Sequence, residues 1–254
     1  MEKNGYLIIK NVLTKDEIEH ANDLLNKEFY EKTHMAHSDL LWYIRTRPSV
    51  VKFYQDHYRT KNLVTSFDGV SWKRKGEESW TLDWHIDQDG RHPPDFCVFQ
   101  STVALSDINI ETGGIQFLKG SHKQFTSLMK KYDRNNDEWE IVFINTSEAH
   151  PKNEDKLMGL DIFQPSVNAG DMIVWDSRCV HRVVSGNIDT ERNVAYMCFV
   201  PRYFVSKDME KIRMDAFEKG ISSTHWPHRF VDRGDSRCPP SKIVKCDEKC
   251  KMFV

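Results

Sequence analysis

The sequence predicts a mostly β fold, a sandwich or barrel with flanking helices, and three observations lead to that prediction. From about residue 64, short runs rich in β-branched and aromatic residues follow one another. Glycine-containing turn signals separate these runs at 113–114, 120 and 170–171. Hydrophobic residues make up 39% of the 254 residues, which is enough for a sizeable core. Because the runs do not alternate with long helical patterns, a parallel α/β sheet is disfavoured.

The N-terminal part is expected to form a short strand over 6–12 and then a helix. Thr14 and Glu17 make a capping-box pattern, in which each side chain bonds the backbone N–H of the other residue. Apolar side chains then recur at the spacing of one helical face. The residues of that face are Ile18, Ala21, Leu25 and Phe29.

A second helix is expected to begin near Pro48, because the fixed φ of proline suits a first helical turn. It should turn Val51 and Tyr54 inward. The predicted strands follow, each bounded by turn signals. They cover residues 79–86, 96–105, 115–118, 172–175, 181–184 and 194–200.

These elements predict one domain with three parts. Residues 1–63 would give helical support, about 64–204 the β core, and 205–254 a partly helical extension. The polar stretch 133–156 looks like an insertion, a flap over a site.

Charge and hydropathy exclude several classes of partner. The chain carries 36 basic and 38 acidic side chains, a net charge of −2, which gives no electrostatic case for nucleic acid or an anionic membrane. No run approaches the roughly 20 apolar residues that a membrane helix needs. The N-terminus also lacks a signal-peptide pattern, so a cytoplasmic protein is expected.

The six cysteines fit that compartment. Cys97, Cys179 and Cys198 fall in apolar segments and are expected to be reduced core residues. The other three lie near the C-terminus without the Cys-x2-Cys spacing of a zinc site, which favours a polar tail. These are Cys238, Cys246 and Cys250.

The strongest chemical signal is the segment WHIDQ at 84–88. On a strand, residues i and i+2 point to one face, so His85 and Asp87 can reach the same metal ion. A second histidine from elsewhere would complete the two-His, one-carboxylate set that leaves positions open for Fe(II) and oxygen chemistry. A similar pair at 37 and 39 precedes the β-rich part and lacks a strand pattern, so it is disfavoured.

The downstream half of the site follows the turn at Gly170. A buried strand is expected over 172–175, and His181 opens the next one. Arg192 stands eleven positions later at the head of another strand. This odd separation lets neighbouring strands present His181 and Arg192 to one pocket, where a guanidinium can hold a carboxylate through two hydrogen bonds.

In these motifs the chain resembles the phytanoyl-CoA dioxygenase-like branch of the Fe(II)/2-oxoglutarate-dependent oxygenases. The resemblance runs from about residue 5 to 204. It implies a double-stranded β-helix core, of the jelly-roll or cupin-like kind. The matching pieces are GYLIIKNVLTKDEI, WHIDQ, STVALSDINIETGGIQFLKGSHK and GDMIVWDSRCVH, followed by Arg192.

The resemblance also implies a cofactor set. Fe(II) would be bound by His85, Asp87 and His181, and Arg192 would hold the distal carboxylate of the cosubstrate 2-oxoglutarate. Further 2-oxoglutarate contacts match Thr102 and Gln100. Family members often carry a hydroxyl residue two positions after the distal histidine, where this chain has Val183; Thr102 and Ser185 both remain open as substitutes.

The implied function is a dioxygenase that uses O2 to oxidise a small molecule and releases succinate and CO2. With Asp87 present, no iron position is vacated for chloride, so hydroxylation, desaturation or ring closure is favoured over halogenation. A non-catalytic β-helix binding protein and a cupin-type metal hydrolase or isomerase are the alternatives, and Arg192 weighs against both. Substrate identity and oligomeric state stay open.

Several other residues have two interpretations. Trp80 and Trp84 could line a pocket but are more typical of a core. His122 is expected to brace a turn, and 73–75 to be a solvated basic loop. The segment 225–228, His-Trp-Pro-His, could cover the mouth of the pocket.

Overall fold

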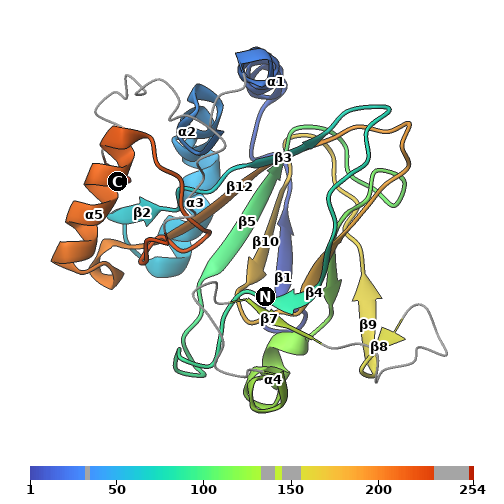
Figure 1. Cartoon of the computed structure of the whole chain (residues 1–254), viewed down its shortest axis with the longest axis vertical. Coiled ribbons are helices and arrows are strands. Elements are labelled where there is room, and N and C mark those ends of the chain that lie inside the picture. The colour runs from blue at the N-terminus through green and yellow to red at the C-terminus, as the bar shows by residue number, and fades with distance from the viewer. Residues whose placement is uncertain (32–34, 133–140, 145–155, 232–251) are drawn as a thin grey trace.

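Two antiparallel sheets face each other in the protein, with most of the helices on the outer side of one sheet (Figure 1). This computed structural model describes residues 1–31, 35–132, 141–144, 156–231 and 252–254. The predicted mostly β fold with a double-stranded β-helix core is confirmed.

The major sheet has six strands in the order β1-β10-β5-β12-β2, with β3 also pairing with β12. All of its pairings are antiparallel. Its first strand comes from the N-terminal part, so the sheet draws on residues well before 64. The strands are β1 (Tyr6–Ile9), β2 (Leu63–Thr65), β3 (Val70–Lys73), β5 (Phe99–Ala104), β10 (Met172–Asp176) and β12 (Arg192–Pro201).

The minor sheet has the order β7-β4-β11-β6-β9-β8. The predicted strand at 181–184 matches β11, and the shortest strands had no counterpart in the sequence prediction. The strands are β4 (Leu82–Ile86), β6 (Gly114–Leu118), β7 (Val142–Phe143), β8 (Lys156–Leu157), β9 (Leu160–Phe163) and β11 (His181–Val184).

Alternation along β5 separates a face packed against helices from a face between the sheets. Ser101 points outward, where its hydroxyl accepts a hydrogen bond from Tyr54 on α3 (Pro48–Tyr58) at 2.9 Å. Gln100 and Thr102 therefore point between the sheets, and both are buried. The strand thus presents two polar side chains to the interior.

The helices cover the outer faces of both sheets. The predicted capping box is formed: Thr14 N–H donates to Glu17 at 2.9 Å, and Glu17 N–H donates to Thr14 at 3.3 Å. Ala21, Leu25, Val51 and Tyr54 are buried as expected, and the Phe29 side chain lies outside the described part. The other helices are α1 (Lys15–Glu31), α2 (Asp39–Arg45), α4 (Phe125–Tyr132) and α5 (Lys207–Lys219), with 3-10 turns η1 (Met35–His37), η2 (Ser121–Gln124) and η3 (Arg202–Phe204).

Some of the segments and cysteines considered in the sequence lie outside the described residues. Most of the predicted insertion at 133–156 and the cysteines at 238, 246 and 250 lie outside the described residues. Cys179 and Cys198 are free and buried, and Cys97 is half-buried. No helix in the described ranges is long and apolar enough to cross a membrane.

The expectation of a solvated basic loop at 73–75 was wrong for Lys73. This residue ends β3, faces Arg192 in the sheet register and is 1% exposed. Its ammonium donates to the carbonyl oxygens of Asn187 at 2.6 Å and of Thr190. The lysine therefore anchors the loop that leads into β12. The sequence alone did not indicate that these carbonyl groups would lie near Lys73.

Replacing Lys73 with methionine is expected to lower the free energy of unfolding by about 1.5–3 kcal/mol, because charged hydrogen bonds are lost and carbonyl groups stay buried. Lys75 is exposed on the same segment, so Lys75→Met is the matched control and should change stability by less than about 0.5 kcal/mol. Urea unfolding of both variants measures the difference. Equal stability of the two variants would contradict the anchoring role.

Candidate metal centre

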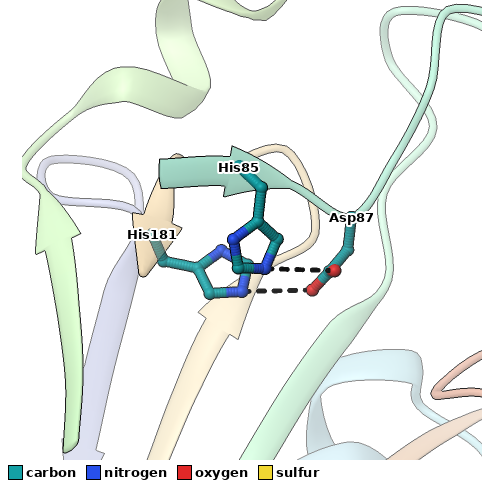
Figure 2. Close-up of side chains that lie close together, drawn as sticks. All are labelled: His85, Asp87 and His181. Atoms are coloured by element: carbon teal, nitrogen blue, oxygen red, sulfur yellow. Dashed lines mark ion pairs between the residues drawn. The ribbon is translucent and has the colours of Figure 1, made fainter. Parts of the chain in front are cut away.

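Two histidines and an aspartate from neighbouring strands converge between the sheets (Figure 2). His85 on β4 and His181 on β11 are direct partners in the antiparallel register, so both side chains lie on the same face. Asp87 follows just after the end of β4. Although it lies one residue beyond the strand, its carboxylate reaches the same point as the two imidazoles.

The three side chains are close enough to share one ion. Asp87 Oδ1 lies 3.5 Å from His85 Nε2, and Asp87 Oδ2 lies 3.1 Å from His181 Nε2. One ligand atom from each residue lies within 4.8 Å of the others, and all three residues are buried. Among the described residues, this is the one group of three or more potential ligands that the structure brings together.

Backbone carbonyls orient both imidazoles. His85 Nδ1 lies 2.6 Å from Asp83 O, and His181 Nδ1 lies 3.0 Å from Cys179 O. Because a carbonyl oxygen can only accept, each Nδ1 carries a proton, so Nε2 is the nitrogen that holds the lone pair in the neutral ring, and it faces Asp87. This is the tautomer that a metal ion requires, held by partners outside the ligand set.

The electrostatics favour the protonation states in which His85 and Asp87 could bind a metal ion. Burial alone would raise the pKa of Asp87, but the charges of His225, His181 and His85 outweigh it and hold that pKa well below its usual range. Burial and the neighbouring His181 lower the pKa of His85 to about 4. A neutral His85 and an ionised Asp87 are therefore favoured near neutral pH.

The low pKa of His85 makes the metal-free protein sensitive to acid. An unfolded histidine binds a proton near pH 6.5, whereas folded His85 does so near pH 4, so acidification in this window favours the unfolded chain. Between pH 7.5 and 5, wild type should lose about 2 kcal/mol more unfolding free energy than His85→Asn. Urea titrations in a chelator measure this difference. An equal loss in both proteins would contradict burial of a neutral His85.

Arg192 enters the same interior from the opposite sheet. The sequence argument placed His181 and Arg192 on neighbouring strands, and this was wrong: β11 is in the minor sheet and β12 in the major sheet. The connection after β11 crosses between the sheets, so the two side chains enter the interior from facing layers rather than side by side.

The guanidinium of Arg192 is buried without an acidic partner in the described part of the chain. Its Nη1 donates to Val184 O at 3.0 Å, and burial lowers its pKa. Gly114 on β6 lies beside it, because a Cβ there would stand at contact distance, 3.8 Å, from Arg192 Cδ. Val184 is three residues along β11 from His181, roughly 10 Å at the rise of a strand. A carboxylate would neutralise this buried charge.

Polar side chains of the major sheet line the interior between the His85–Asp87–His181 group and Arg192. Gln100 lies opposite Trp175, whose ring centroid is 5.6 Å from that of His181. Both amide atoms of Gln100 are buried, and the described residues offer them no hydrogen-bond partner. Thr102 lies opposite Tyr196, and burial raises the pKa of that tyrosine to about 12 although the charge of Arg192 opposes the shift. An unsatisfied buried amide is costly, so Gln100 fits a polar ligand placed here.

The remaining sequence candidates have structural roles or lie elsewhere. His37 bonds Ile221 O at 2.8 Å and so braces the fold, whereas Asp39 is exposed in the first turn of α2. His122 braces the N-terminus through Glu2 O at 3.2 Å, as expected. Trp84 is buried in the core, whereas Trp80 is exposed. Of the two hydroxyl residues that could substitute for the one missing at Val183, Ser185 is exposed and Thr102 is buried.

The structure gives more information on His225 than the sequence did. Its charge lowers the pKa of both Asp87 and His85, so the C-terminal segment 221–231 approaches the three ligands. Its Nε2 is buried, with no hydrogen-bond partner in the described part of the chain. The neighbouring Trp226 is buried against the ring of His92, 5.3 Å away. The sequence motif at 225–228 was the one signal for this approach.

Comparison with known proteins adds family evidence to this geometry. Residues 53–191 match the family described as phytanoyl-CoA dioxygenase (PhyH). The protein called Ava biosynthesis cluster protein O, from Aspergillus versicolor, is 29% identical over 219 residues, which are 82% of this chain and 69% of that protein.

Two solved structures share the fold. The epimerase SnoN, in complex with Fe3+, alpha-ketoglutarate and nogalamycin RO, is 17% identical with a TM-score of 0.57, covering 78% of this chain and 80% of that one. HygX from Streptomyces hygroscopicus, with nickel and 2-oxoglutarate bound, is 17% identical with a TM-score of 0.56, covering 80% and 84%. Since the family match spans more than half of the sequence, the chain belongs to the phytanoyl-CoA dioxygenase (PhyH) family of Fe(II)/2-oxoglutarate-dependent oxygenases.

Proposed function

We propose that this protein oxidises a small molecule with O2, using Fe(II) bound by His85, Asp87 and His181 and 2-oxoglutarate as cosubstrate. The observation that carries the proposal is the pairing of two complementary features. A buried two-histidine, one-carboxylate set has its Nε2 lone pairs turned toward one point, and a buried arginine shares the same interior without an acidic partner among the described residues.

The donor set fits iron and its cosubstrate. Two imidazoles and one carboxylate are the facial set of non-haem Fe(II) oxygenases and leave positions for other ligands. Arg192 offers a dicarboxylate a charge partner, and the unsatisfied amide of Gln100 and the hydroxyl of Thr102 offer hydrogen bonds. A catalytic site that needed only a metal-bound water would have no use for this arginine.

The chain's own residues have three tasks in the reaction. The ligands fix the metal, and the carbonyls of Asp83 and Cys179 keep each imidazole in the required tautomer. Arg192 binds and orients the cosubstrate, while burial of the site excludes water from reactive species. When bound, iron would activate O2, the oxidant, with two electrons supplied by 2-oxoglutarate as it is converted to succinate and CO2 and two by the substrate.

A small molecule is the proposed substrate class. The relative from Aspergillus versicolor is named for a biosynthesis cluster, and SnoN was solved with nogalamycin RO, which supports a natural product over a macromolecule. His225 offers a polar group from the C-terminal segment, because its charge acts on Asp87 and its buried Nε2 has no hydrogen-bond partner in the described residues. Hydroxylation, desaturation and ring closure all fit the proposal.

Release of succinate tests the proposed activity without knowledge of the substrate. Protein loaded anaerobically with Fe(II) and 2-oxoglutarate is exposed to O2, and succinate is measured by mass spectrometry. Wild type is expected to form succinate slowly in the uncoupled reaction, and an Asp87→Ala control should not. Succinate at the same low level in both proteins would argue for a binding protein without turnover.

A further inference from the structure

Two loops adjoin the proposed metal ligands, and they lie against each other. The β4–β5 loop begins at Asp87, and the β10–β11 loop leads into His181, the first residue of β11. These loops also hold polar residues that the proposed chemistry does not use. Gln88 and Ser177 are the fully buried members of that group, each 0% exposed.

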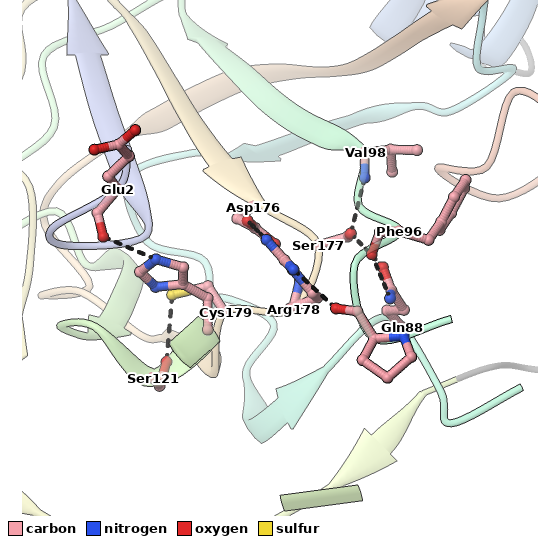
Figure 3. A network of polar contacts seen from close by, with 11 residues as sticks. Glu2, Gln88, Phe96, Val98, Ser121, Asp176, Ser177, Arg178 and Cys179 are labelled. Carbon is pink, nitrogen blue, oxygen red and sulfur yellow. Dashed lines mark hydrogen bonds and ion pairs between the residues drawn. The ribbon is translucent and has the colours of Figure 1, made fainter. Parts of the chain in front are cut away.

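A chain of hydrogen bonds joins these two residues and their loops (Figure 3). The Ser177 hydroxyl donates to Gln88 Oε1 at 2.7 Å and accepts from the backbone N–H of Val98 at 3.1 Å. Gln88 Nε2 donates to Phe96 O at 2.9 Å. Both side-chain amide atoms and the hydroxyl are thus satisfied inside the protein, with geometry that leaves little freedom.

Further bonds hold the same two loops in register. The Ser177 backbone N–H donates to Val98 O at 3.0 Å. Arg178, fixed by Asp176 at 2.7 Å, donates to Pro94 O at 2.9 Å (Figure 3). The side-chain bond between Gln88 and Ser177 is the part of this network that adjoins a proposed ligand, because Gln88 directly follows Asp87.

We propose that Gln88 and Ser177 are positioning residues that set the separation of the Asp87 carboxylate from the His181 imidazole. Asp87 lies beyond the end of β4, where the sheet no longer fixes it, so the Gln88 side chain supplies the constraint that the strand does not. His181 follows Ser177 by four residues, and the bond ties both ligands to one rigid element. This inference rests on the proposed function, since it assigns the bridge a role toward the metal.

Cobalt(II) titration of Gln88→Leu tests the bridge, because the visible absorption of bound Co(II) reports both affinity and ligand geometry. Loss of an outer-shell partner typically weakens metal binding about 10–100-fold, and that loss is expected here. The spectrum at saturating Co(II) should also change in intensity or position. A role in stability alone would leave that saturated spectrum unchanged.

Gln164→Leu is the matched control. Gln164 is also a glutamine that accepts one side-chain bond, from Gln116 at 2.9 Å, and donates to one backbone carbonyl, Asn109 O at 2.9 Å. It lies outside the ligand-bearing loops, so its removal should leave the Co(II) dissociation constant within about twofold of wild type.

Two milder variants keep the test informative if Gln88→Leu does not fold. Ser177→Ala removes only the hydroxyl and should weaken Co(II) binding and alter the spectrum in the same direction. Gln88→Glu keeps the acceptor for Ser177 but not the donor to Phe96, so its binding should lie between those of wild type and Gln88→Leu. Since the two residues share one bond, Gln88→Leu combined with Ser177→Ala should cost less than the sum of both.

The outcomes separate this inference from the proposed function. If wild type binds Co(II) and the Gln88 and Ser177 variants bind it with the wild-type affinity and spectrum, the bridge has no positioning role. If wild type itself binds no Co(II), the proposed metal centre is wrong and the inference falls with it. Weakened binding with an altered spectrum in these variants, but not in Gln164→Leu, supports the bridge.

Discussion

Replacing Asp87 with alanine is expected to abolish tight binding of Fe(II). The carboxylate lies between both imidazoles, 3.5 Å from His85 Nε2 and 3.1 Å from His181 Nε2, and it is the one negative charge in the ligand set. Outer-shell changes alone cost about 10–100-fold in metal affinity, so loss of a direct ligand should exceed about a hundredfold. Anaerobic equilibrium dialysis of Fe(II) against wild type and variant measures the change.

Asp83→Ala is the matched control for this experiment. Asp83 lies on the same strand two residues before His85, is exposed, and contributes only its backbone carbonyl, which alanine retains. Iron binding by this variant should match wild type within about twofold. Tight binding of one equivalent of iron by Asp87→Ala would remove Asp87 from the ligand set.

Replacing Arg192 with methionine is expected to weaken 2-oxoglutarate binding by about 2–5 kcal/mol, at least thirtyfold, while Fe(II) binding is kept. The buried guanidinium has one hydrogen bond, to Val184 O, and no acidic partner among the described residues. Methionine keeps an apolar stem of similar length, so the metal-free protein should change in unfolding free energy by less than about 1 kcal/mol. Thermal stabilisation by 2-oxoglutarate in the presence of Fe(II) reports the loss.

Arg182→Met separates this effect from a general loss of arginine. Arg182 lies on β11 next to His181, but it bonds Gln116 at 2.8 Å and stacks on Trp84, on the other face of the sheet. Its replacement should leave the stabilisation by 2-oxoglutarate intact. An Arg192→Met protein that saturates with 2-oxoglutarate as readily as wild type would show that another group holds the carboxylate.

Local periodicity explains why the convergence of His85 and Asp87 could be predicted from sequence, while their role as metal ligands stays a prediction. An i, i+2 spacing in an extended chain does not depend on which strands are neighbours. The order of strands in a sheet, in contrast, cannot be predicted from local spacing. His181 and Arg192 were expected side by side, yet they come from facing sheets, because an eleven-residue separation does not reveal where the connection crosses.

Other features escaped prediction because their partners are distant in sequence. The carbonyls that hold Lys73 lie more than a hundred positions away, so its charge looked like that of a surface residue. Gln88 and Ser177 stand inside recognised motifs, but nothing local shows that their side chains meet across 89 positions. Strands of two residues, such as β7 and β8, are too short for any alternation to appear.

A crystal structure of protein grown anaerobically with Fe(II) and 2-oxoglutarate would test the proposed site most directly. We expect one metal ion in contact with the imidazoles at 85 and 181 and the carboxylate at 87, and the far carboxylate of the cosubstrate on the guanidinium at 192. Iron bound at other residues, or a cosubstrate whose far carboxylate has another partner, would contradict it.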